Sequence, residues 1–186
     1  MEGSLAGKLL VAMPGISDPR FQQAVILMCQ HSADAAMGLI LNKPRAELTL
    51  GDVLSHLGLQ APPGVAARGV LAGGPVHEDR GYVLHSEDFS SPDATLPVIP
   101  GIGLTATRDV LAAMAAENPP ERFVLALGHS GWGAGQLESE LQHNAWLVAE
   151  PDQSIIFGET HEAKWSSAIR QLGLEPSQLM GESGRA

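Results

Sequence analysis

Residues 123–135 read FVLALGHSGWGAG, an apolar run that passes directly into a glycine-rich segment. A continuous apolar run of this length is typical of a strand covered on both faces. Glycine permits positive φ and lets a ligand approach the main chain, and the free amides that begin a helix favour anions. The sequence therefore predicts a strand at 123–127, a turn at 128–135 and a helix at about 135–142.

This predicted turn is the first candidate for a ligand-binding surface. Two other turns would share the cleft, one at residues 73–77 and one after the helix. The competing interpretation is a purely structural turn that packs Trp132 against its neighbours. The candidate binding residues are Gly74, His129, Ser130, Trp132, Gly133 and Asn144.

Known catalytic motifs do not fit this segment. A nucleophile elbow needs G-x-S-x-G, but Trp132 occupies the place of the last glycine. A P-loop needs a lysine that the segment lacks, and the spacing of the glycines is wrong for a dinucleotide fingerprint. A hydrolase that uses Ser130 with His129 or a distant histidine stays open as a hypothesis. Catalytic residues are otherwise unassigned.

The rest of the chain predicts an α+β fold, with a bent mixed sheet or small barrel surrounded by helices. Strand pairs alternate irregularly with strand–loop–helix units, which argues against a regular doubly wound sheet. With 44% hydrophobic residues, 186 residues suffice for a single domain spanning 1–186, with 181–186 frayed. The predicted strands are 8–13, 24–29, 37–41, 69–72, 81–85, 102–106, 123–127, 145–149 and 155–157; helices begin near 49, 107, 135 and 160, and 86–101 is a loop.

Charge and composition disfavour several classes of function. The net charge is −10, and the 11 basic residues are spread along the chain, so no basic face for nucleic acid is visible. The histidines lack metal-ligand spacing, so no metal and no cofactor are expected. No apolar run reaches the roughly 20 residues of a membrane helix, and the lone Cys29 reads as a buried, inert thiol. These features predict a cytoplasmic protein, with Glu138 and Glu140 on a solvated helix face.

Taken together, the motifs resemble those of the YqgE/AlgH family of bacterial proteins, over nearly the whole chain. The resemblance implies an α+β fold with a strongly bent sheet and a regulatory role, and it supplies no catalytic residues. Two departures stand out: Gln30 replaces an acid before the histidine, and His129-Ser130 replaces an aromatic–small pair. The matching segments are 13–15 (MPG), 18–21 (DPRF), 29–31 (CQH), 38–44 (GLILNKP), 73–76 (GGPV), 80–85 (RGYVLH), 131–138 (GWGAGQLE), 140–141 (EL), 144–147 (NAWL), 157 (F) and 164–165 (KW).

Three functional hypotheses follow. The first is a non-enzymatic regulatory or binding protein for a small anion or a protein partner, which acts on transcription indirectly. The second is an enzyme that hydrolyses a phosphorylated or acyl small molecule with Ser130 and His129. The third is a direct transcriptional regulator, which the family label supports and the charge disfavours.

Overall fold

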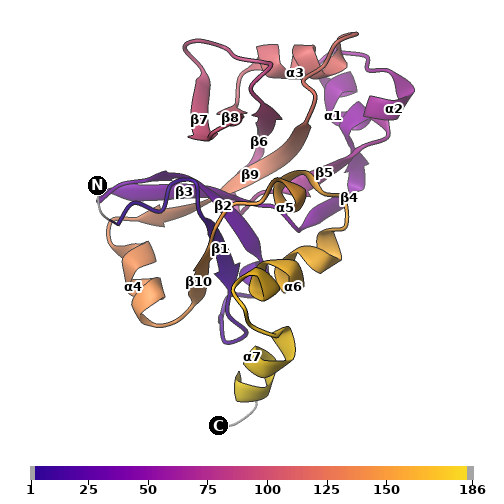
Figure 1. Ribbon diagram of the computed structural model, residues 1–186. Helices are drawn as coiled ribbons and strands as arrows, with labels where there is room; N and C mark the ends of the chain where they lie inside the picture. The colour runs from indigo at the N-terminus through magenta and orange to yellow at the C-terminus, as the bar shows by residue number, and fades with distance from the viewer. Residues whose placement is uncertain (1–2, 184–186) are drawn as a thin grey trace.

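The computed structural model describes residues 3–183 and shows one curled, largely antiparallel sheet flanked by helices (Figure 1). Its strand order is β10-β1-β2-β3-β9-β6-β8-β7, with β4 and β5 off this path. The strands are β1 (Leu9–Ala12), β2 (Val25–His31), β3 (Ala35–Ile40), β4 (Pro44–Thr49), β5 (Gly69–Ala72), β6 (Val76–Ser86), β7 (Thr95–Ile99), β8 (Ile102–Thr105), β9 (Phe123–Gly133) and β10 (Trp146–Ala149). The predicted α+β class with a bent sheet is confirmed, and the sheet forms a half-barrel.

The helices cover different parts of this sheet. Figure 1 shows α1, α2 and α3 together at one end of the molecule, with α7 at the opposite end. The helices are η1 (Pro19–Phe21, a 3-10 turn), α1 (Leu50–His56), α2 (Pro63–Ala66), α3 (Arg108–Ala115), α4 (Gln136–Gln142), α5 (Gln153–Phe157), α6 (His161–Gln171) and α7 (Pro176–Ser183). The start of α1 carries a capping box of the T-x-x-D pattern in the sequence, because the side chain of Thr49 and that of Asp52 each accept the other's backbone N–H.

The apolar side chains of strand β2 are buried on both faces of the sheet. Val25, Leu27 and Cys29 belong to one hydrophobic cluster, which also contains Trp165 of α6. The alternate residues Ile26 and Met28 belong to a second cluster, which lies under α4. Side chains of a strand alternate between its two faces, so an uninterrupted apolar run requires cover on both. The prediction for this run is therefore confirmed.

Strand β9 corrects the prediction for the glycine-rich segment. The strand does not stop at Leu127 but continues through Gly133, where residues 130–133 pair antiparallel with β3. Its main chain is thus engaged in the sheet and does not form a ligand-facing turn. Gly128 has φ +78°, and a Cβ there would lie 2.4 Å from the carbonyl oxygen of Gly74. The glycine serves a close approach between two segments of the protein itself.

Two smaller predictions are also wrong. Residues 155–157 belong to helix α5, because the Asp152 side chain accepts the Ser154 amide and caps a helical turn. The expected loop at 86–101 contains edge strand β7. Helix α7 ends at Ser183, and residues 184–186 of the segment expected to fray lie outside the described part, so that expectation stays a prediction.

Candidate ligand-binding site

A cleft of about 610 Å³ opens beside the second half of β9, and six strands line it. Its polar side is formed by Gln30, Arg80, Tyr82 and His129. The apolar residues on its other walls include Met37, Leu96 and Leu104. We call it the His129 cleft. A mixed pocket of this size, with a few polar groups on apolar walls, suits a small organic ligand.

A bulge in β6 brings basic side chains to this cleft. Val76 pairs with His129 and Gly81 pairs with Leu127, so four residues of β6 stand opposite the single residue Gly128. The bulged residues 77–80 leave the ladder, and His77 adopts φ +48°. The ring of His77 lies 5.7 Å from that of His129, between centroids. The local break in pairing therefore places a histidine and Arg80 at the rim.

His129 and Tyr82 form the polar centre of the cleft. The Tyr82 hydroxyl and His129 Nδ1 are 2.9 Å apart. Burial, followed by the nearby His77 and Arg80, lowers the pKa of His129, so its ring is neutral at pH 7. Burial also raises the pKa of Tyr82, which keeps the phenol protonated. A phenol that donates to Nδ1 leaves the Nε2–H of His129 as a free donor.

Arg80 supplies the positive charge of the cleft. Its guanidinium carbon lies 5.5 Å from the centre of the Tyr82 ring. Within residues 3–183 it forms no ion pair at 4 Å or less. An arginine without a carboxylate partner at the rim of a mixed cleft favours an anionic group on a ligand.

Two of the predicted binding residues pack against the protein's own main chain and line neither the His129 cleft nor the second cleft beside α4. Ser130 is fully buried, and its hydroxyl donates to the carbonyl oxygen of Gly73 at 3.1 Å. A Cβ at Gly74 would lie 2.2 Å from the carbonyl oxygen of His129, so Gly74 packs on the main chain of β9. The structure thus brings residues 73–74 and 128–130 together, as a packed junction and not as facing walls of a cleft.

Two of the remaining predicted residues, Trp132 and Asn144, line a second cleft of about 470 Å³ on the α4 side, and Gly133 lines neither cleft. We call this second cleft the Glu140 cleft. Trp132 lines both clefts, while Asn144 lines only the second and holds φ +58° in the turn after α4. The amide of Gly133 donates to the Gln136 side chain at 3.1 Å. The six candidate residues therefore do not form one site.

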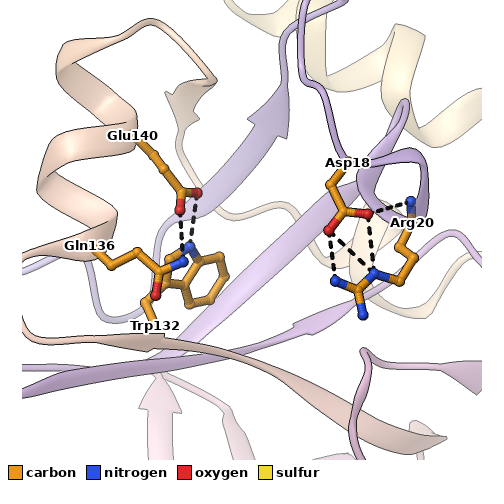
Figure 2. A network of polar contacts seen from close by, with 5 residues as sticks. All are labelled: Asp18, Arg20, Trp132, Gln136 and Glu140. Atoms are coloured by element: carbon orange, nitrogen blue, oxygen red, sulfur yellow. Dashed lines mark hydrogen bonds and ion pairs between the residues drawn. The ribbon is translucent and has the colours of Figure 1, made fainter.

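Glu140 is the residue that sequence reasoning placed wrongly. Its Oε1 accepts the indole N–H of Trp132 at 3.1 Å and its Oε2 accepts the Gln136 amide at 3.0 Å (Figure 2). Oε1 also accepts the indole N–H of Trp146 at 2.9 Å. Glu138 remains on the solvated face as expected, with its side chain 47% exposed, and it also contacts Nε2 of His31 at 2.6 Å. The available signal was a tryptophan eight residues before Glu140 and another six residues after it, and this spacing alone does not show that either side chain contacts the acid.

Residues 3–183 contain neither a cluster of metal ligands nor a helix that could span a membrane. In that range no group of three or more His, Cys, Asp and Glu residues is arranged to hold a metal ion. None of the helices described there combines the length and the apolar character that crossing a bilayer requires.

The fold and these clefts define a class of α+β proteins with a curled sheet and with α4 packed against the central strand β9. The chain belongs to the AlgH-like family (DUF179), whose model matches residues 9–177. This confirms the family resemblance deduced from the sequence motifs.

Individual relatives extend over nearly the same length. A UPF0301 protein of Caulobacter vibrioides is 51% identical over 98% of this chain and 94% of its own. One of Ruegeria pomeroyi is 46% identical over 98% and 99%. The solution structure of the AlgH protein from Pseudomonas aeruginosa matches with a TM-score of 0.81 at 38% identity, covering 100% of this chain and 98% of that one. The crystal structure of protein DIP2367 from Corynebacterium diphtheriae shares the fold at 19% identity, with a TM-score of 0.72 over 96% and 91%.

Proposed function

We propose that this protein is a non-enzymatic binding protein whose His129 cleft takes a small organic anion with an apolar tail. The observation that carries the proposal is the unpaired Arg80 beside the His129–Tyr82 pair, opposite Met37, Leu96 and Leu104. The anionic head would lie at Arg80 and the Nε2–H of His129. The apolar tail would lie against the opposite walls.

The charge of the whole protein sharpens this assignment. A chain of net charge −10 repels anions at long range, so a general anion sink is disfavoured. Specific binding then needs contact with a cationic group and burial of the tail. Arg80 offers a planar fork of donors that suits carboxylate or phosphate.

The hydrolase alternative has weaker support. Ser130 and His129 are neighbours on a strand, so their side chains point to opposite faces. The Ser130 hydroxyl is buried against Gly73 and has no histidine partner among the described hydrogen bonds. Cys29, the one thiol, is buried, and burial raises its pKa to about 12, which makes it inert as a nucleophile.

Regulation would follow from ligand binding. A small anion that closes the mouth of the half-barrel would change the surface that a protein partner meets, and transcription would be affected indirectly. Direct DNA binding is disfavoured by the dispersed basic residues. The cytoplasmic location expected from the sequence is part of this proposal.

Calorimetric titration with hexanoate, hexyl phosphate and hexanol tests the site. We expect the two anions to bind and hexanol to bind at least about 10-fold more weakly than either anion. Arg80→Gln should weaken anion binding about 10-fold, since a charge-assisted hydrogen bond contributes about 1.5–3 kcal/mol. The exposed Arg170, which faces Glu175 on another surface, provides the control Arg170→Gln. Equal affinity for hexanol and hexanoate, or an unchanged Arg80→Gln variant, would contradict the proposal.

A further inference from the structure

The Glu140 cleft differs from the His129 cleft in the charge that it presents. It lies between the β1–β2 connection and α4, and its walls include Ile16, Asp18, Phe21, Trp132 and Glu140. Asp18 is already paired with Arg20, through a contact of 2.8 Å between a carboxylate oxygen and Nη2. In Figure 2 this ion pair lies apart from Glu140, across the view. Glu140 is therefore the charged group of the cleft that lacks an oppositely charged partner in residues 3–183.

Three neutral donors hold the Glu140 carboxylate in place. The two indole N–H groups saturate Oε1, while Oε2 accepts only the Gln136 amide. A carboxylate offers about four lone-pair positions, so one position on Oε2 is left. All three donors are uncharged, so the negative charge of the group is not compensated. A fixed carboxylate of this kind is preorganised for a cation, because its orientation is settled before binding.

Aromatic rings surround this carboxylate. Trp132 and Trp146 meet edge to face at 6.2 Å between centroids, and Phe21 meets Trp146 in the same way at 5.8 Å. These contacts fix an aromatic wall on one side of the cleft, while polar residues such as Ser17, Ser139 and Asn144 line other parts of it. An aromatic wall beside one fixed carboxylate suits a short aliphatic chain that ends in a cationic group.

We propose that the Glu140 cleft binds a small organic cation, with a primary ammonium or guanidinium group against Oε2 of Glu140 and its aliphatic chain along Phe21 and Ile16. This site is distinct from the His129 cleft, which presents a positive charge. The two clefts share Trp132 but would select ligands of opposite sign.

The three tryptophans provide a direct readout. Trp132 and Trp146 donate their indole N–H to Glu140, whereas Trp165 donates to the carbonyl oxygen of Ala12 in the core, at 2.8 Å. In a titration with agmatine followed by ¹⁵N NMR, we expect the Trp132 and Trp146 indole signals to shift with saturation and the Trp165 signal to stay. Butanol, a neutral probe, should leave all three in place.

Two variants make the test specific. Glu140→Gln keeps an acceptor for the indoles but removes the charge, and it should weaken agmatine binding about 10-fold or more. Glu162→Gln, an exposed residue of α6, removes the same charge elsewhere and should leave binding unchanged, which controls for general attraction by an acidic protein. Ser139→Lys should block binding by placing a tethered ammonium in the cleft, a test that does not alter Glu140.

Several outcomes would overturn the proposal. These are shifts that fail to saturate, equal weakening in Glu140→Gln and Glu162→Gln, or butanol shifts equal to those of agmatine. A second arm uses a pentapeptide with one central arginine. Binding of the peptide without binding of agmatine would show that the site reads a protein partner and would reject the small cation.

Discussion

The two halves of strand β9 differ in role: the first half lies in the hydrophobic core, and the second half borders the candidate binding clefts. Residues 123–127 lie between β6 and β5, and their side chains are buried or nearly so. Residues 130–133 pair with β3, and within this half His129 lines the His129 cleft, while Gly131 and Trp132 line both that cleft and the Glu140 cleft. The halves meet at Gly128, where the 73–74 segment packs on the main chain. Both halves pair with neighbouring strands through their main chains. They differ in their side chains, which are packed in the core in the first half and border open clefts in the second.

The largest expected effect is at the junction of the two halves. Gly74→Ala places a Cβ 2.2 Å from the carbonyl of His129, and only backbone movement relieves that contact. We expect a loss of about 3 kcal/mol in the free energy of unfolding, measured by urea denaturation. Gly133→Ala is the control, because a Cβ at Gly133 would have no neighbouring atom within 4 Å, and it should change the free energy of unfolding by about 0.5 kcal/mol or less. A stable Gly74→Ala variant would show that the junction adapts and that the halves are not locked together.

A smaller effect is expected inside the second half. Ser130→Ala removes the hydrogen bond to Gly73, whose carbonyl keeps the bond from the Ile40 amide at 2.9 Å. We expect a loss of about 1 kcal/mol in thermal or urea unfolding and unchanged anion binding. The exposed Ser139→Ala should have no effect. An unchanged stability, together with loss of a hydrolytic activity in a substrate screen, would restore Ser130 as a nucleophile.

The smallest expected effect is on the pH dependence of the free energy of unfolding, and it comes from His129, the residue after Gly128 in β9. The pKa of folded His129 is lowered, so below its ordinary value of about 6.5 the unfolded chain binds more protons. The stability contribution is therefore present above about pH 6.5 and is lost as the pH falls through the folded pKa. The pKa of His161 is also lowered, chiefly because the side chain is partly buried. His129→Gln and His161→Gln should each flatten the fall in unfolding free energy towards acid pH, and an unchanged slope in both would contradict this origin.

The core half of β9 was predictable and the site half was not. An apolar run such as 123–127 carries its own evidence, because burial on both faces requires apolar side chains. In residues 128–133, local glycine preference indicated a turn, but pairing with β3, about 95 residues earlier, overrode it. Glu140 of α4 was assigned to solvent for the same reason, since Trp146 reaches it through the packing of β10 against β1.

The sequence by itself determined the fold class, the burial of β2, the cap of α1, the inert setting of Cys29 and the family. Each of these follows from composition, periodicity or motifs read along the chain. Only the tertiary structure decided that His129, Tyr82 and Arg80 share one cleft, that Ser130 is sealed, and that two indoles hold Glu140. Those facts depend on strand register and on a bulge, and a shift of one residue in either would send each side chain to the opposite face.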